Sequence, residues 1–289
     1  MSPREYDESD ARIRPSRTTR RRTKDRPSHS DSITAFVTTV DRGRTTCVTD
    51  DGVVITAMKA RELGPKSVVV GDLVSIVGDI SGTDGSLARV VAVLPRRNSL
   101  TRTIDDHEND ERVIVANVDQ IAIVISTTNP EPREGFVDRA LVVAFDQGIT
   151  PIIIMTKQDL ASGDEFLKTY TDLDIIIHKI DRKSDLTTLK KVLSKKITVL
   201  LGHSGVGKST LVNNLLGSTE NSESTSDIRN AYRATGDVNE VTGRGRHTSS
   251  SAIALPLTPT FSGEEFGWII DTPGVRSFGI AHVQPSRVI

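Results

Sequence analysis

Cysteine is almost absent from this chain, since Cys47 is the only one among 289 residues. A single cysteine excludes a disulfide within the chain and a zinc site built from several cysteine ligands. This composition fits a reducing, cytosolic compartment. We interpret Cys47 as a small residue of a strand, because an unpaired cysteine packs like a small apolar side chain.

Long apolar runs are also missing. No stretch is long enough to cross a bilayer, and the charged N-terminus lacks the apolar segment of a secretory signal. We therefore expect a cytoplasmic protein that does not span a membrane. The 36% hydrophobic and 26% charged residues are ordinary for soluble proteins and suffice for a sizeable core. At roughly 100–200 residues per domain, the length predicts two domains.

The net charge of −1 hides a strongly basic segment near the N-terminus. Between Ala11 and Ser30, eight basic residues face one acidic residue, Asp25. Such an apolar-poor segment cannot bury enough surface to fold alone. It is a solvated tail, an artefact of the start site, or an arm that binds nucleic-acid phosphate with counterion release. The basic residues are Arg12, Arg14, Arg17, Arg20, Arg21, Arg22, Lys24 and Arg26.

Short strand patterns predict a small all-β barrel over residues 32–95. Gly and Asp turns separate the strands, and no helix pattern interrupts them. About five strands in about sixty residues are typical of an OB-like barrel, although an SH3-like barrel would show a similar pattern. The β-rich stretches are Ile33–Val37, Val53–Ile55, Ser67–Val70 and Leu73–Val77.

The pattern changes after Pro95, where buried strands alternate with helices. This alternation predicts an α/β domain over residues 96–289, with a mostly parallel sheet covered by helices on both faces. Residues 1–31 would then form a basic disordered arm ahead of the two domains. The expected strands are Val118–Ile125, Pro151–Met155, Ile175–Ile177, Ile197–Leu201 and one beginning at Ile269, and the expected helices are Phe136–Gln147 and Thr210–Leu216.

A phosphate-binding loop follows the predicted strand Ile197–Leu201. The segment matches G-x-x-x-x-G-K-[ST] at every fixed position, and a helix pattern follows it, as the motif requires. Its backbone N–H groups would surround phosphate oxygens, Lys208 would reach the β and γ phosphates, and the Ser209 hydroxyl would bind Mg²⁺. The predicted nucleotide-binding residues here are Gly202, His203, Ser204, Gly205, Val206, Gly207, Lys208, Ser209 and Thr210.

A second motif distinguishes GTP from ATP. Thr156-Lys157-Gln158-Asp159 follows the predicted strand Pro151–Met155 and resembles the guanine-recognition motif Asn-Lys-x-Asp. The Asp159 carboxylate can accept from both guanine N1–H and N2–H₂, which adenine does not offer. The stem of Lys157 would lie along the base. Thr156 replaces the usual Asn, so one amide contact should be missing or weaker.

Two further segments complete a predicted magnesium site. Asp271-Thr272-Pro273-Gly274 follows a strand, and in P-loop proteins an Asp here holds Mg²⁺ through water while the Gly N–H meets the γ-phosphate. Thr248, at the end of Gly243-Arg244-Gly245-Arg246-His247-Thr248, would bind Mg²⁺ when that loop orders around the γ-phosphate. The predicted Mg²⁺ ligands are therefore Ser209, Thr248 and Asp271.

His247 is our candidate for positioning the attacking water. Most GTPases have a Gln just after the glycine that Gly274 represents, but here Val275 cannot hydrogen-bond water. The imidazole of His247 titrates near neutral pH and could orient water or accept a proton. Alternatively, His247 packs or contacts RNA. The predicted catalytic residues are His247, Lys208 and Thr248.

The order of the motifs is circularly permuted. An ordinary GTPase has its base motif last, whereas here Thr156–Asp159 precedes Gly202–Ser209, which precedes Thr248 and Asp271–Gly274. With these motifs and with Leu94–Leu100 and Ala116–Gln120, the sequence closely resembles the ribosome small-subunit-dependent GTPase A family. The resemblance covers most of the chain from Ile33 onward.

The resemblance implies an OB domain that binds ribosomal RNA and slow GTP hydrolysis that is stimulated by the 30S subunit during its late maturation. Its implied partners are the 30S ribosomal subunit, 16S rRNA and ribosome-binding factor A, and its implied cofactor is Mg²⁺ with GTP. We expect a monomer. The family also has a C-terminal zinc domain, but this sequence ends at Ile289, and we expect no zinc site in it. Ile177–Asp181 fits the family's Ser-Ala base-backing loop only loosely.

Two other functions remain open. The chain could be an OB-fold rRNA-binding factor that senses the nucleotide state with negligible turnover. It could also be an ATP-using P-loop kinase or transport ATPase. Nucleotide competition separates ATP from GTP use, and turnover with and without 30S subunits separates an enzyme from a sensor.

Overall fold

The computed structural model describes residues 31–41, 43–64, 67–103, 111–216, 252–257 and 267–272. All described elements belong to one compact unit, Asp31–Ile289. The predicted Arg12–Arg26 arm lies outside the described residues. No helix in the described part of the chain is long and apolar enough to span a membrane.

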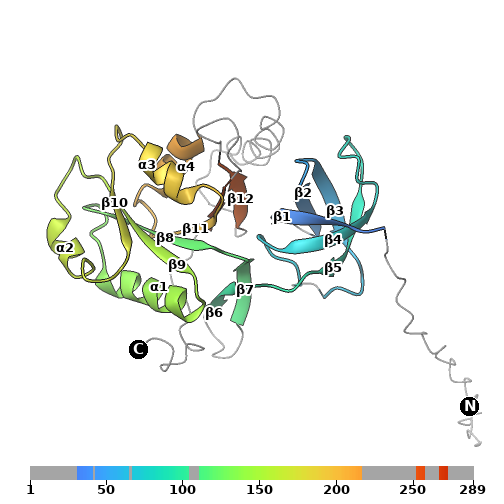
Figure 1. Cartoon of the computed structure of the whole chain (residues 1–289), viewed down its shortest axis with the longest axis horizontal. Coiled ribbons are helices and arrows are strands. Elements are labelled where there is room, and N and C mark those ends of the chain that lie inside the picture. The colour runs from blue at the N-terminus through green and yellow to red at the C-terminus, as the bar shows by residue number, and fades with distance from the viewer. Residues whose placement is uncertain are drawn as a thin grey trace, which may run out of the picture. The chain divides into compact units, whose positions relative to one another are not determined.

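Five strands close into a barrel (Figure 1). Strand β1 pairs with both β2 and β4, β2 pairs with β3, and β5 pairs with both β3 and β4, which completes the ring. This ring fits the expected OB-like barrel. The strands are β1 (Ile33–Asp41), β2 (Arg44–Thr49), β3 (Val54–Lys59), β4 (Leu73–Gly78) and β5 (Ala88–Val93).

The barrel core contains Cys47, as expected for a small strand residue. Cys47 lies in β2 and is fully buried among apolar side chains such as Val37 and Ile55. Burial raises the pKa of its thiol to about 12. Because the thiolate is the reactive form of cysteine, Cys47 is chemically inert in the folded protein.

The prediction of a strand at Ser67–Val70 is wrong. Only Val70 makes a bridge, to Val115, while Ser67–Val69 are irregular and lead into a turn in which the Asp72 N–H donates to Val69 O. The turn is held by a carboxylate rather than by strand pairing, because the Val69 N–H donates to Asp72 Oδ2 at 2.8 Å. Val68 packs in the barrel core and Val70 packs in the core that includes α1, so this apolar run is buried without strand pairing and was mistaken for a strand.

Asp72 is fully buried and forms a bidentate ion pair with Arg96. Arg96 Nε donates to Asp72 Oδ1 at 2.7 Å, and its terminal nitrogen donates to Asp72 Oδ2 at 2.9 Å. The same terminal nitrogen reaches Ser67 O at 2.9 Å. The pair therefore ties the end of the barrel, just after β5, to the turn that precedes β4.

Replacing Asp72 with asparagine should destabilise the protein. One acceptor becomes an amide donor, which leaves either the Val69 N–H or the Arg96 guanidinium unpaired, and breaking such a pair costs about 3 kcal/mol. Urea unfolding would measure the change in free energy. Asp50→Asn, at an exposed position, is the control. Equal unfolding midpoints for the two variants would contradict a structural role for the ion pair.

The second half of the chain forms an α/β layer structure around a mostly parallel sheet. The strand order is β10-β9-β8-β11-β13-β12, and only the β12–β13 pair is antiparallel. The strands are β8 (Gln120–Ser126), β9 (Thr150–Thr156), β10 (Ile176–Lys179), β11 (Ile197–Leu201), β12 (Ile253–Pro256) and β13 (Trp268–Asp271).

Helices cover the two faces of this sheet (Figure 1). Alternate residues of β8 divide between two cores, so that Ile121 and Ile123 pack with α1 while Ala122 and Val124 pack with α3 and α4. This division explains why β8 is buried at every position. The helices are α1 (Glu134–Asp146), α2 (Asp164–Lys168), α3 (Thr187–Leu193) and α4 (Lys208–Leu216).

The barrel and the α/β layers are joined by strand pairing and by side-chain contacts. Strand β1 pairs with β12 at Thr39 and Ile253, and the Phe36 and Trp268 rings lie 4.8 Å apart. A separate hairpin, β6 (Ser99–Thr103) with β7 (Glu111–Ala116), follows the barrel. Immediately after it, Asn117 Nδ2 donates to Gly71 O in the barrel at 2.9 Å.

Candidate nucleotide-binding site

The loop between β11 and α4 has a backbone that requires glycine. Gly205 and Gly207 have φ values of +83° and +96°, in the left-handed region that side chains disfavour. A Cβ atom at Gly202 would lie 2.4 Å from Val124 O. Helix α4 begins at Lys208, directly after the loop, so its N-terminal N–H groups and partial positive charge face the loop.

Lys208 and Asp271 form the charged part of this site. Lys208 Nζ donates to two loop carbonyls, Gly202 O at 2.5 Å and His203 O at 3.0 Å. Burial lowers the pKa of Lys208, and the Asp271 charge opposes this shift. Burial likewise raises the pKa of Asp271, against the effect of Lys208. The two charges therefore lie close enough to stabilise each other in a largely buried place.

One oxygen of Asp271 is available to a ligand. Asp271 Oδ1 is buried and makes no hydrogen bond to any described residue. The neighbouring Thr272 is buried, and its hydroxyl donates to Leu200 O at 3.0 Å, which fixes the end of β13 beside β11. A buried carboxylate oxygen with no protein donor fits a place where water or a cation completes its shell.

Thr156, at the end of β9, connects the base motif to the phosphate loop. Its side chain is buried, and its hydroxyl donates to Val206 O at 2.6 Å, with Ile125 O at 3.2 Å. The residue that replaces the usual asparagine thus still contacts the loop. The sequence predicted only a missing or weaker amide contact and could not identify this hydroxyl bond.

Lys157 is held along one wall of the site. It has a φ of +59°, and Thr127 Oγ1 donates to its carbonyl at 2.8 Å. Its ammonium donates to Thr128 O at 3.2 Å and also to Asn129 O. These bonds anchor the end of the side chain, so its aliphatic stem forms a fixed surface on which a planar group can lie.

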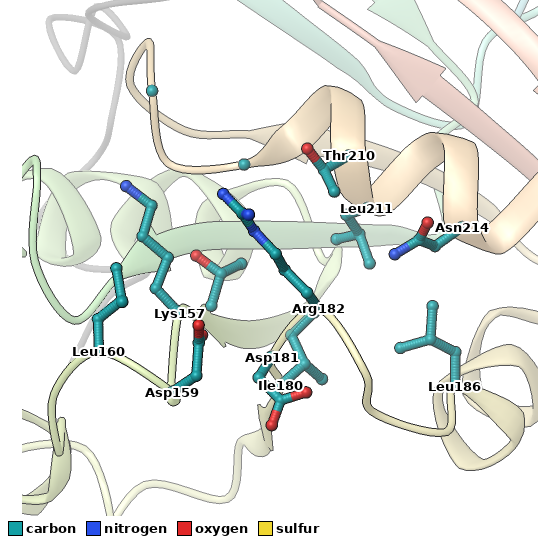
Figure 2. A pocket seen from close by; sticks show the side chains of 13 residues that line it. Lys157, Asp159, Leu160, Ile180, Asp181, Arg182, Leu186, Thr210, Leu211 and Asn214 are labelled. Carbon is teal, nitrogen blue, oxygen red and sulfur yellow. The ribbon is translucent and has the colours of Figure 1, made fainter.

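A cavity of about 370 Å³ joins the two motifs (Figure 2). Its lining includes three residues of the base motif, Thr156, Lys157 and Asp159, and three from the loop and α4, Gly205, Gly207 and Thr210. Two more lining residues, Ile180 and Asp181, belong to the segment Ile177–Asp181 that only loosely fits the family's base-backing loop. The sequence analysis did not identify the remaining lining residues, which are Leu160, Arg182, Leu186, Leu211 and Asn214.

Other predicted site residues do not line this cavity. Gln158 is turned away, with its backbone N–H donating to Ile180 O at 3.3 Å and its side-chain nitrogen buried. Asp271 and Lys208 are not part of the lining either. His247, Thr248 and Gly274 lie outside the described residues.

Comparison with known proteins identifies the family. Residues 93–281 match the family model of the RsgA GTPase. The chain belongs to the RsgA GTPase family. The resemblance to the ribosome small-subunit-dependent GTPase A family in the sequence is thus confirmed, and the RsgA match begins at the end of the barrel.

Relatives with the name small ribosomal subunit biogenesis GTPase RsgA are similar over most of this chain. The protein of Shewanella oneidensis is 36% identical over 250 residues, which cover 83% of this chain and 64% of that protein. The protein of Haemophilus influenzae is 33% identical over 230 residues, 77% of this chain and 60% of that protein. The chain therefore spans less than two thirds of the length of these relatives.

Solved structures support the permuted fold. The crystal structure of YjeQ from Thermotoga maritima is 25% identical, with a TM-score of 0.57 over 84% of this chain and 75% of that one. YloQ, described as a circularly permuted GTPase, has a TM-score of 0.57 at 19% identity and covers 91% of this chain and 78% of its own. In this chain too, the base motif after β9 precedes the phosphate loop after β11.

Proposed function

We propose that this chain binds and hydrolyses GTP and that the 30S ribosomal subunit stimulates this reaction during maturation of the subunit. The observation that carries the proposal is the single cavity lined by Lys157 and Asp159 on one side and by Gly205, Gly207 and Thr210 on the other. A nucleotide needs a pocket for its base and a loop for its phosphates, close enough together that one molecule contacts both. The names of the relatives, all small ribosomal subunit biogenesis GTPases, supply the partner.

The residues present fit Mg²⁺ held together with GTP. Mg²⁺ in nucleotide sites uses one or two protein ligands and substrate phosphates rather than a full protein cage. The described residues contain no cluster of three or more His, Cys, Asp or Glu side chains, while Asp271 Oδ1 is a buried carboxylate oxygen without a donor. Ser209 would bind the ion directly and Asp271 through water. The ion neutralises charge on the β and γ phosphates.

Each protein group has a separate task in this proposal. Lys208 exchanges its bonds to the loop carbonyls for bonds to the β and γ phosphates, which stabilises charge that develops on them. Asp159 accepts from the guanine edge. We also assign the remaining Mg²⁺ contact to Thr248, the γ-phosphate contact to Gly274, and the positioning of water to His247.

The barrel is proposed as the part that binds 16S rRNA. OB barrels bind oligonucleotides on one strand face, and β1 of this barrel also pairs with β12 next to the nucleotide site. We further infer that the protein acts as a cytoplasmic monomer and that ribosome-binding factor A is a neighbour on the same subunit.

Turnover with and without 30S subunits tests the proposal. We expect slow GTP hydrolysis by the chain alone and clear stimulation by 30S subunits, because Val275 stands where most GTPases have a water-orienting Gln. Binding to 30S should weaken steeply with salt, since phosphate contacts release counterions. Salt-dependent binding without any stimulated turnover would instead establish the alternative, an rRNA-binding nucleotide sensor.

A further inference from the structure

Arg182 lies in the turn between β10 and α3, and this turn is fixed to the base motif. Ile180, two residues earlier, accepts from the Gln158 N–H at 3.3 Å. Asp181 Oδ1 accepts from the Lys183 N–H at 2.7 Å, which gives the turn a defined path. The position of Arg182 beside the base motif is therefore set by the backbone and does not depend on a contact of its own side chain.

The Arg182 side chain lines the cavity and has no protein partner there. Figure 2 shows it rising from the turn so that its guanidinium lies between Lys157 and Thr210. It makes no hydrogen bond or ion pair with any residue that the structure describes, whereas Arg96 and Arg97 are both paired with carboxylates. A guanidinium carries five N–H donors and a planar π system, so an unpaired one in a cavity is available to a ligand.

The rest of the cavity indicates which part of a nucleotide Arg182 meets. Asp159, at the foot of the cavity, is the acceptor for the base edge, and Gly205 and Gly207 belong to the phosphate loop. Arg182 comes from the side of the base motif, not from the phosphate loop, and it stands opposite the stem of Lys157. A flat purine whose edge meets Asp159 would therefore have one face toward Lys157 and the other toward Arg182.

We propose that Arg182 is a nucleotide-binding residue whose guanidinium stacks on the face of the guanine base opposite Lys157. Guanidinium groups stack on aromatic planes through cation–π and π contacts. The inference rests on the proposed GTP-binding function and adds a second wall to the base pocket. No pattern in the sequence indicates this role. Arg182 follows the segment Ile177–Asp181, which itself fits the family's base-backing loop only loosely.

A stacking role has two consequences that an edge contact does not have. Stacking does not depend on the pattern of donors on the base, so Arg182 should raise affinity for guanine and xanthine nucleotides alike, while Asp159 sets the choice between them. The stacking energy is also the same in the ground state and in the transition state, because the base does not react. Loss of stacking should therefore raise KM and leave kcat unchanged.

Three substitutions in the full chain separate the contribution of the planar guanidinium group of Arg182 from the contribution of its charge. Arg182→Phe keeps a planar group without the charge, Arg182→Lys keeps the charge without the plane, and Arg182→Ala removes both. We expect the alanine and lysine variants to bind GDP about tenfold more weakly, and the phenylalanine variant to bind within about threefold of wild type. Isothermal titration with GDP and XDP measures this, with Arg139→Ala, at an exposed position of α1, as control.

The alternatives give different patterns. If lysine keeps wild-type affinity and phenylalanine loses it, Arg182 contacts phosphate and the stacking proposal is wrong. If none of the three variants changes GDP affinity, while circular dichroism shows a native fold, Arg182 does not touch the nucleotide. If the wild-type chain binds no GDP at all, the proposed function itself fails, and the wild-type titration shows this independently of the variants.

Discussion

Alanine in place of Lys208 should reduce GTP hydrolysis by about 10³-fold or more, with and without 30S subunits. In the structure, the ammonium is held at the mouth of the loop by Gly202 O and His203 O, and Asp271 balances its charge. No other described lysine or arginine donates to the loop carbonyls, so the substitution removes the one positive charge that is bonded to the loop. Release of inorganic phosphate under single-turnover conditions measures the loss.

The control for Lys208→Ala must distinguish the loss of a catalytic group from a change in the structure of the loop. Lys191→Ala, at an exposed position of α3, removes a lysine of the same domain and should keep wild-type turnover. Ser209→Ala should cripple hydrolysis as well, because it removes the hydroxyl that we propose as the direct Mg²⁺ ligand. Wild-type turnover by Lys208→Ala, with native circular dichroism, would mean that the loop does not bind the phosphates of GTP.

The parallel sheet was largely predictable because its strands are continuous apolar runs. Ile197–Leu201 was predicted with the bounds that β11 has, and β8 and β9 differ from prediction by one or two residues at each end. Strands β2 and β5 were not identified. In β2, Thr45 and Thr46 interrupt the apolar pattern, although Thr45 is fully buried. Threonine suits a pleated strand, but hydrophobic periodicity does not register it.

The candidate site was predictable only where function imposes a fixed local spacing. Each of the two motifs, Gly202–Ser209 and Thr156–Asp159, consists of consecutive residues. Their patterns can therefore be recognised in the sequence. The position of Arg182 depends on the parallel pairing of β9 with β10, and the bond from Thr156 to Val206 depends on the pairing of β8 with both β9 and β11. These pairings bring segments together that are distant in the sequence. No single segment carries that information.

Strand pairing next to the site also gives a physical route between nucleotide and barrel. Strand β13 ends at Asp271, β12 pairs with β13, and β1 of the barrel pairs with β12. Phe36 of β1 lies against Trp268 of β13, at the opposite end of that strand from Asp271. A change in the position of Asp271 on binding Mg²⁺ and GTP would therefore act on a strand that contacts the barrel directly.

Asparagine at position 159 should change which base the chain prefers. In the proposed base pocket, the Asp159 carboxylate accepts two hydrogen bonds from guanine, whereas an amide would accept only one and would oppose the guanine N2–H₂ with its own N–H₂. Losing a charge-assisted pair of this kind should weaken GDP binding about 10²-fold. The same amide can donate to the 2-oxo group of xanthine, so XDP should become the tighter ligand.

Competition against a labelled nucleotide measures this change in base preference directly. The wild-type chain should bind GDP and GTP at least tenfold more tightly than ADP and ATP, because only guanine donates twice to one carboxylate. Asp181→Asn is a matched control, since Asp181 lines the same cavity but is engaged by the Lys183 N–H and the Ser184 hydroxyl. It should keep the guanine preference. If ATP competes as well as GTP, or if Asp159→Asn binds GDP and XDP as the wild type does, then Asp159 does not read the base, and the cavity beside Lys157 is not a guanine pocket.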